Sequence, residues 1–383
     1  MITLKINDQD IKVEEGTTVL QAAEQAGIVL PTLCNHPDLT PYGGCRLCNV
    51  EVKGARMSLS ACTLPASEGM DVATHTSELE DSRKSVLELL LSNYYAEDIS
   101  SDGENDLIRL ANQYQVDIGK YVRKSPRYEI NSDPNPVIFV DLNKCILCTR
   151  CVRACSEIQG RFVWGVSERG LESKITAGAG SFMLDARCES CGACAAYCPT
   201  GALSDRAKVE LDDITELTKV RTTCSYCGVG CNFDLNVHDD RVVRVTSAED
   251  APVNGMSLCV KGRYGYDYIH HPDRLTRPLV RAGLLDNVEE RIASGDWKIA
   301  DFQAKTPEGQ SASIGNLDTF IQTDWDTALD VTANKFTETK KLHGPDAFAV
   351  LASAKCTNEE NYLFNKFTRQ MLMTNTIDHC ARL

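Results

Sequence analysis

The sequence lacks any long apolar run: nowhere in its 383 residues do about eighteen apolar residues follow one another, as a membrane-spanning helix requires. Its start, MITLKINDQDIKVEEG, lacks the basic flank, the apolar stretch and the twin-arginine pair of a secretory signal. A cytoplasmic location without membrane insertion is therefore the default expectation.

Basic residues are also in short supply. The 40 Lys and Arg residues are outnumbered by 54 Asp and Glu, which gives a formal net charge of −14. Nucleic-acid binding needs a basic stripe that faces the phosphates. We therefore expect no nucleic-acid partner, and a chain this acidic is better suited to docking on basic patches of other proteins.

Cysteine, by contrast, is abundant. The chain has 18 cysteines, and all but Cys356 and Cys380 fall into four groups of four. In a chain expected in the cytoplasm, so many cysteines favour metal binding over disulfides. Cys356 and Cys380 are interpreted as small buried hydrophobic residues.

Two of the groups share the spacing C-x2-C-x2-C-x3-C. They are Cys145, Cys148, Cys151 and Cys155, and Cys188, Cys191, Cys194 and Cys198. This is the bacterial ferredoxin pattern, in which three cysteines bind one 4Fe-4S cluster and the fourth binds its neighbour. We therefore expect Cys198 to complete the first cluster and Cys155 the second. Two structural zinc ions are the alternative, although zinc ribbons use two cysteine pairs rather than a three-plus-one repeat.

The other two groups have wider spacing. Cys34, Cys45, Cys48 and Cys62 follow C-x10-C-x2-C-x13-C, with Gly43 and Gly44 where backbone amides must approach the metal centre closely. Cys224, Cys227, Cys231 and Cys259 follow C-x2-C-x3-C-x27-C and predict a further 4Fe-4S site. Zinc stays open for the Cys34 group on spacing alone.

Apolar periodicity predicts the elements around these cysteines. Residues 2–13 alternate as a hairpin, and a helix should follow with Thr18 and Gln21 at capping-box spacing and Gly27 at its end. Two amphipathic helices are predicted between 80 and 130, and a second hairpin over 233–245. After residue 325 the pattern reads helix, strand, helix, with Thr357 and Glu360 as a second capping box.

The Cys34 group, within its hairpin and helix, resembles the 2Fe-2S domain at the head of the large iron-sulfur subunit of respiratory complex I and of iron-only hydrogenases. This resemblance implies one 2Fe-2S cluster. Those families hold another cluster with one histidine and three cysteines, but here the ligand positions fall on Tyr94, Asp98, Ser101 and Leu107. That cluster should therefore be absent.

The Cys224 group, which ends in Cys259-Val-Lys261, is similar to the N-terminal cluster domain of molybdopterin oxidoreductases of the dimethyl sulfoxide reductase type. The resemblance implies that Lys261 lies between cluster and pterin and helps to pass electrons. From residue 221 on, ASAKCTNEENYLFNKFTR and TNTIDHCARL are similar to formate dehydrogenase catalytic subunits. The full-length protein would then bind molybdenum or tungsten through bis-molybdopterin guanine dinucleotide.

In that family the next residue after the closing stretch is a selenocysteine or cysteine that ligates the metal, followed by a catalytic histidine. The chain ends at Leu383, one residue earlier, which is where a UGA codon read as a stop would end it. A fragment is the alternative. We expect no catalytic residue within the chain, which should hold clusters without oxidising formate.

These patterns together predict an α+β multidomain iron-sulfur protein. Its expected parts are a β-grasp 2Fe-2S ferredoxin-like domain (1–79), a helical connector (80–135), a two-cluster 4Fe-4S ferredoxin domain (136–216), a molybdopterin oxidoreductase 4Fe-4S domain (217–275) and the truncated start of a molybdopterin-binding α/β domain (276–383). The chain should carry one 2Fe-2S and three 4Fe-4S clusters.

The function that this resemblance implies is formate oxidation to carbon dioxide, or the reverse. Electrons would pass Lys261 to the Cys224 cluster, then the two ferredoxin cubanes and the 2Fe-2S centre. A flavin subunit that reduces NAD or NADP, a hydrogenase subunit or a ferredoxin would collect them. The alternatives are a non-catalytic electron-transfer subunit like the large subunit of complex I, an iron-only hydrogenase and a nitrate reductase.

Overall fold

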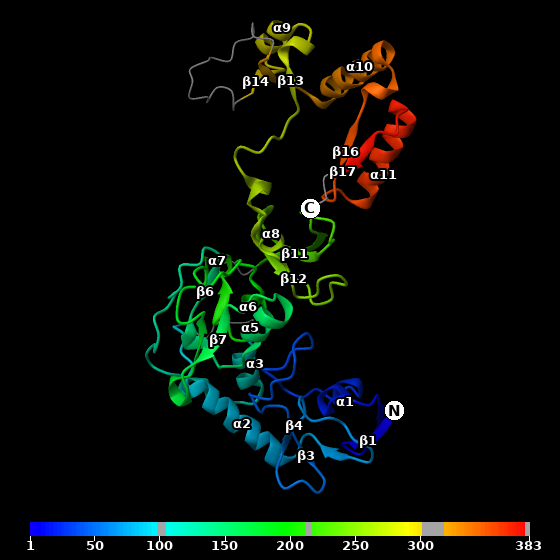
Figure 1. Ribbon diagram of the computed structural model, residues 1–383. Helices are drawn as coiled ribbons and strands as arrows, with labels where there is room; N and C mark the ends of the chain where they lie inside the picture. The colour runs from blue at the N-terminus through cyan, green and yellow to red at the C-terminus, as the bar shows by residue number, and fades with distance from the viewer. Residues whose placement is uncertain (98–104, 211–215, 301–317, 380–383) are drawn as a thin grey trace. The chain divides into compact units, whose positions relative to one another are not determined.

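The computed structural model describes residues 1–97, 105–210, 216–300 and 318–379 (Figure 1). The chain forms two compact units. The first comprises Met1–Thr222 and Cys231–Gly265, and the second comprises Thr223–Gly230 and Tyr266–Leu383. Within the described ranges, no helix has both the length and the apolarity that a membrane crossing demands.

The chain begins with a five-stranded mixed sheet in the order β2-β1-β5-β3-β4. The predicted hairpin is confirmed, with Asn7 and Asp8 both at positive φ in its turn. Strand β1 pairs in parallel with β5, which joins the hairpin to the rest of the sheet. The strands are β1 (Ile2–Ile6), β2 (Gln9–Val13), β3 (Asn49–Val52), β4 (Leu59–Ser60) and β5 (Asp71–Ala73).

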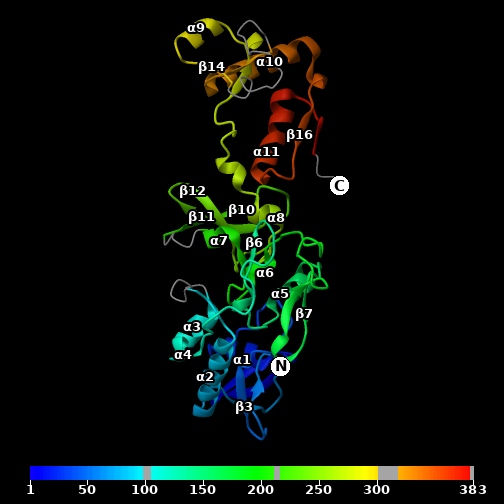
Figure 2. The ribbon, with the colours of Figure 1, turned by 90° about the vertical axis from the view of Figure 1, so that its left-hand side faces the viewer.

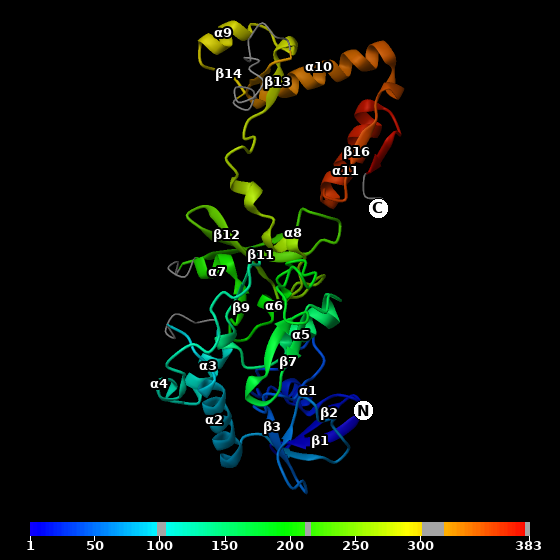
Figure 3. The ribbon, with the colours of Figure 1, turned by 60° about the vertical axis from the view of Figure 1, so that its left-hand side comes forward.

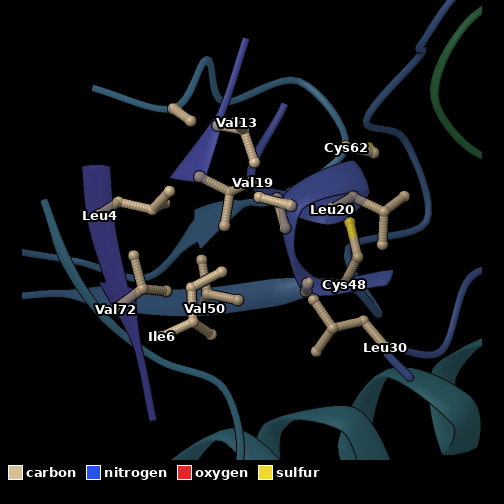
Figure 4. Packing of buried hydrophobic residues seen from close by; sticks show 14 residues of the cluster. Leu4, Ile6, Val13, Val19, Leu20, Leu30, Cys48, Val50, Cys62 and Val72 are labelled. Atoms are coloured by element: carbon tan, nitrogen blue, oxygen red, sulfur yellow. The ribbon is translucent and has the colours of Figure 1, made fainter. Parts of the chain in front are cut away.

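Helix α1 (Val19–Gln25) packs on this sheet in the β-grasp arrangement. The predicted capping box is present, because Thr18 accepts from the Gln21 backbone amide and the Gln21 side chain accepts from the Thr18 amide. Figure 4 shows Val19 among apolar side chains of the strands and Leu20 on the side of Cys48, and Cys62 belongs to the same core. The cysteine-bearing loops are therefore anchored to the domain's own core.

Three helices follow: α2 (Ser77–Ser92), α3 (Asp106–Gln113) and α4 (Ile118–Tyr121), the last of which was not predicted (Figure 3). Leu87, Leu91 and Leu107 are fully buried, as the amphipathic pattern predicts for the first two helices. Tyr94 packs in the same core, and its hydroxyl accepts from Asn105 Nδ2 at 2.7 Å. Tyr94 and Leu107 thus occupy apolar surroundings, whereas Asp98 and Ser101 lie outside the described residues.

The next region contains two cysteine loops, each followed by a single-turn helix, α5 (Arg150–Arg153) or α6 (Ala193–Ala196). Two antiparallel strand pairs frame them. The pairs are β6 (Ile138–Val140) with β9 (Leu203–Asp205), and β7 (Trp164–Ser167) with β8 (Lys174–Ala177). Helix α7 (Arg206–Glu210) follows directly after β9.

A second hairpin completes the first unit. Strand β11 (Asn232–His238) pairs with β12 (Arg241–Ser247) around a turn at Asp239 and Asp240, as predicted. Strand β10 (Thr218–Thr223) extends the sheet to three strands, and α8 (Val260–Tyr264) begins immediately after Cys259.

The second unit has a small sheet in the order β13-β15-β14. Further along the chain, two parallel strands precede and follow α11, and Figure 2 shows the first of them, β16, beside that helix. The predicted helix, strand, helix order and the Thr357–Glu360 capping box are confirmed. The elements are β13 (Leu279–Arg281), α9 (Val288–Ala293), β14 (Lys298–Ile299), β15 (Phe320–Gln322), α10 (Trp325–His343), β16 (Val350–Ala352), α11 (Asn358–Phe367) and β17 (Ile377–His379). Neither α10 nor α11 has a buried residue.

Candidate metal centres

The first cysteine group is gathered in one buried place. Cys34, Cys45, Cys48 and Cys62 are each at most 9% exposed. Cys34 contacts the thiols of Cys45 and Cys62, and Cys62 also contacts Cys48. Hydrogen bonds from the Cys45 and Cys62 thiols lower the pKa of Cys34 to about 2. Donating to Cys34 raises the pKa of Cys45 and of Cys62. Four sulfur ligands therefore converge, and their proton sharing favours a thiolate, the form that binds iron.

Backbone packing explains the two glycines in this loop. The amide N–H of Cys45 donates to Cys34 Sγ at 3.4 Å. Gly43 has a φ of +69°, and a Cβ there would lie 3.1 Å from Thr63 Cγ2. A Cβ on Gly44 would lie 2.3 Å from Tyr42 Cε1, so the chain could not follow this course with a larger residue unless Tyr42 moved. The expected close approach of the backbone to sulfur is present.

A buried arginine on α2 fixes the backbone of this loop through hydrogen bonds. Arg83 on α2 is 1% exposed, and its Nε donates to Leu47 O at 3.0 Å. Its Nη2 donates to Asn49 O at 3.1 Å and to Thr74 O at 2.7 Å. The carbonyls on either side of Cys48 are thus satisfied by one guanidinium group. No local pattern signals this role, because the contacts to Leu47 and Asn49 span more than thirty residues.

The two ferredoxin-type loops have the same backbone conformation. Leu147 and Ser190, each the second residue after the first cysteine of its group, have φ values of 56° and 54°. Their amides donate to Cys145 Sγ and Cys188 Sγ at 3.5 and 3.2 Å, respectively. Thr149 and Gly192, four residues after the same cysteines, also have positive φ. The sequence repeat is therefore a structural repeat.

Within this repeat the fourth cysteine of each group lies with the other loop. Cys145, Cys148 and Cys151 each interact electrostatically with Cys198. Cys188, Cys191 and Cys194 each interact with Cys155. The fourth cysteine of each group therefore lies near the three of the other loop, and the assignment of each set of four to one cluster stays a prediction.

Burial makes these thiols suitable for a positively charged core. It raises the pKa of Cys145 and of Cys148 to about 12, because the thiolate would lose its hydration. An iron-sulfur core supplies positive charge where water is excluded, so buried thiolates become favourable once it binds. The donor set therefore fits iron-sulfur clusters.

Two further donors face cysteines of these groups, one at Cys155 and one at Cys194. The Val163 amide donates to Cys155 Sγ at 3.3 Å. The buried indole N–H of Trp164 has no nitrogen or oxygen acceptor among the described residues, but it lies against the Cys194 thiol. Burial raises the pKa of Cys194, and this N–H group lowers it. A cluster thiolate would satisfy this N–H group, and such hydrogen bonds tune cluster potentials. Sequence reasoning did not identify Trp164.

The fourth group is divided between the two units. Cys231 and Cys259 belong to the first unit, and Cys224 and Cys227 to the second. Cys259 immediately precedes α8, on which Lys261 is exposed. The assignment of these four cysteines to one cluster, and the role of Lys261, stay predictions.

Of the two remaining cysteines, Cys356 is half-buried, and Cys380 lies outside the described residues. In the part of the chain that the structure describes, no three His, Cys, Asp or Glu side chains are placed to hold a single metal ion. The thiols of the Cys34 group contact one another instead.

Comparison with protein families agrees with this order of sites. Residues 1–77 match a 2Fe-2S iron-sulfur cluster binding domain, and residues 135–204 match the ferredoxin-like domain of NADH-quinone oxidoreductase subunit 3. Residues 217–271 match the molybdopterin oxidoreductase Fe4S4 domain, and residues 274–383 match the molybdopterin oxidoreductase domain. The matched iron-sulfur and molybdopterin oxidoreductase domains therefore follow one another in the predicted order.

Several curated proteins are similar along the whole chain. The NADPH-Fe(3+) oxidoreductase subunit alpha of Geobacter sulfurreducens is 34% identical over 100% of this chain and 40% of its own length. An NADH-quinone oxidoreductase subunit of Rhizobium meliloti is 33% identical with the same coverage. A Staphylococcus aureus protein named "Putative formate dehydrogenase" is 28% identical over 100% of this chain and 39% of its own length. The chain thus spans about two fifths of the length of these relatives.

A solved structure also resembles this chain. In the crystal structure of an NAD+-reducing NiFe-hydrogenase in the H2-reduced state, one chain is 32% identical with a TM-score of 0.50. The match covers 54% of this chain and 88% of that chain.

Proposed function

We propose that this chain, which carries the iron-sulfur and molybdopterin domains of an oxidoreductase, is the amino-terminal part of a formate dehydrogenase catalytic subunit. In the whole protein, formate would yield carbon dioxide, one proton and two electrons. A molybdenum or tungsten bis-molybdopterin guanine dinucleotide would supply the two-electron chemistry. The residues of this chain would carry the electrons away, one at a time, through three 4Fe-4S clusters and one 2Fe-2S cluster.

The observation that carries the electron-transfer part is that cysteines of neighbouring groups share buried cores: Cys148 packs against the core that contains Cys34, and Cys151 shares a core with Cys194. Cys34 interacts with Cys148, which belongs to the next group along the path. Cys151 in turn interacts with Cys194 of the second ferredoxin loop. Clusters bound at these positions would be neighbours, so an electron could pass from the Cys194 loop to the Cys34 loop. We assign Cys198 to the Cys145 cluster and Cys155 to the Cys188 cluster.

Support for formate as the substrate comes from the second unit. There β16 pairs in parallel with β17, so Leu351 lies opposite Asp378 and Ala352 opposite His379. The two stretches that resemble formate dehydrogenases are thus side by side. The glycine-rich cysteine loop adjoins them, because a Cβ on Gly228 would lie 3.5 Å from Ala354 Cβ. The "Putative formate dehydrogenase" relative agrees with this assignment.

Formate-dependent reduction of the clusters tests the proposal. The full-length protein, purified without oxygen from its native host, is mixed with formate while the electron paramagnetic resonance of the reduced clusters is recorded. Appearance of the 2Fe-2S and 4Fe-4S signals with formate, at about fourteen iron atoms per chain, is the expected result. Full reduction by dithionite with none by formate would overturn the choice of substrate.

A second candidate is a non-catalytic electron-transfer subunit resembling the large subunit of complex I. The higher identity to the NADPH-Fe(3+) oxidoreductase and NADH-quinone oxidoreductase subunits favours it. In this case a flavin partner subunit with NADH or NADPH would reduce the clusters, and formate would not. The same experiment, repeated with the co-purified partner subunits and each nucleotide, separates the two functions.

A further inference from the structure

The loops of the Cys34 group and of the first ferredoxin group are joined by one buried side chain. Arg153 on α5 is 8% exposed, and its Nη2 donates to Cys34 O at 2.6 Å and to Cys148 O at 3.1 Å. Its Nη1 donates to Thr40 O at 2.5 Å. One planar guanidinium group therefore fixes the backbone of a cysteine from each of two metal centres.

The other end of the ferredoxin region has an equivalent contact. Arg263 on α8 is 2% exposed, and its Nε donates to Cys191 O at 3.1 Å. Its Nη2 donates to Ser247 Oγ, at the last residue of β12, at 2.7 Å and to Met256 O at 3.2 Å. Arg263 thus ties the second ferredoxin loop to the hairpin region that carries Cys231 and Cys259.

The two arginines share features that a surface cation lacks. Both are buried, and their described hydrogen bonds go to carbonyl and hydroxyl oxygens rather than to carboxylates. Glu157 interacts electrostatically with Arg153 without such a bond in the described contacts. A buried positive charge beside a cluster stabilises the reduced form, which carries one more negative charge. Only arginine offers donors in a rigid fork that reaches several carbonyls at once.

We propose that Arg153 and Arg263 are positioning residues for electron transfer between neighbouring clusters. Each holds the backbone carbonyl of a cluster cysteine against another part of the first unit. Arg153 thereby fixes the separation of the Cys34 and Cys145 clusters, Arg263 fixes the loop of the Cys188 cluster, and each raises the reduction potential of the cluster beside it. The transferred species is one electron, and no bond forms or breaks. The inference rests on the cluster assignment of the proposed function, but not on formate as the substrate.

The test uses the full-length protein with its clusters, reduced with dithionite, as wild type and as the Arg153→Lys and Arg153→Met variants. Electron paramagnetic resonance measures the magnetic interaction between the reduced 2Fe-2S cluster and its neighbouring 4Fe-4S cluster, and a redox titration gives the 2Fe-2S potential. We expect both variants to lose the splitting, because a single ammonium group cannot hold two loops. Only Arg153→Met should lower the potential, because lysine keeps the charge.

Arg161→Met is the matched control, since the guanidinium group of Arg161 is exposed and pairs with Glu189 rather than with a cysteine carbonyl. It should keep both the splitting and the 2Fe-2S potential. An unchanged splitting in both Arg153 variants at full iron content would overturn the proposal. Because dithionite supplies the electrons, failure to oxidise formate leaves this result unaffected.

Hydrogen exchange gives a second measurement that does not depend on iron content. In Arg153→Lys, amides of residues 34–40 should exchange faster than in the wild type, while those of the β1–β2 hairpin should not change. Equal protection of residues 34–40 in the two proteins would show that Arg153 does not hold this loop, and the proposal would be wrong. The corresponding variant Arg263→Lys should speed exchange at residues 190–193.

Discussion

Gly192 lies so close to Arg263 that a Cβ on this glycine would be 2.4 Å from Arg263 Cδ. The same Cβ would be 2.4 Å from the hydroxyl of Tyr264, which is hydrogen-bonded to Asp205. Gly192 also has a φ of +75°, where a side chain is strained. A larger residue at this position would therefore have to displace the side chains of Arg263 and Tyr264.

Gly192→Ala should consequently destabilise the first unit by about 1–3 kcal/mol, through backbone strain and overpacking together. Gly201→Ala is the control, because Gly201 has a φ of +69° with open space around its Cβ position. Gly201→Ala should destabilise the first unit less than Gly192→Ala does, by about 1 kcal/mol from backbone strain. Thermal unfolding of the iron-loaded proteins measures both, and equal midpoints would contradict the packing argument.

The exchange of fourth cysteines between the two ferredoxin loops predicts a pattern of iron loss. Cys198→Ser should remove the same cluster as Cys145→Ser, so the double variant Cys145→Ser/Cys198→Ser should lose about four iron atoms, no more than either single variant. Cys188→Ser/Cys198→Ser should lose about eight. Iron analysis and Mössbauer spectra check this, and the reverse pattern would assign Cys198 to the Cys188 cluster.

Arg83→Met should destabilise the first unit by about 3 kcal/mol, because it leaves buried carbonyl oxygens at Leu47, Asn49 and Thr74 without a donor. The 2Fe-2S absorption should also be lost at a lower urea concentration than in the wild type. Lys84→Met, at the next and exposed position of α2, removes the same charge and should change little. Similar urea midpoints for the two variants would exclude a special role for Arg83.

Helix α10 should show a pH dependence that originates at its N-cap. Hydrogen bonds from the amide and hydroxyl of Thr327 lower the pKa of Asp324 from 3.8 to about 2. The depressed folded-state pKa means that this stabilisation is complete above pH 4 and disappears as the pH falls towards 2. Urea unfolding of the second unit, followed by circular dichroism, should show this loss in the wild type and not in Asp324→Asn, which cannot ionise.

Local signals were enough to predict much of the fold. Thr18 and Gln21 predict the start of α1, because both partners of a capping box lie within one helical turn. The cysteine spacing likewise predicted two matching loops, because three thiols so close together restrict the backbone to few conformations.

Contacts between distant segments could not be predicted in the same way. Arg153 reaches residues more than a hundred positions away, and its own neighbourhood in the sequence resembles any short basic helix. Trp164 and its unsatisfied N–H group were missed for the same reason, since only the folded chain places them beside Cys194. Helix α4 was missed because four residues are too few to show helical periodicity.

The reciprocal placement of Cys155 and Cys198 also bears on how such a domain could have arisen by gene duplication. A single ancestral copy, with one loop and one following cysteine, could have completed a cluster in this arrangement only by pairing with a second identical copy. Fusion of the two copies into one chain would convert that dimer into the present domain. Once fused, neither half could be deleted without leaving the other with an incomplete set of ligands, so the pair would be inherited as a single unit.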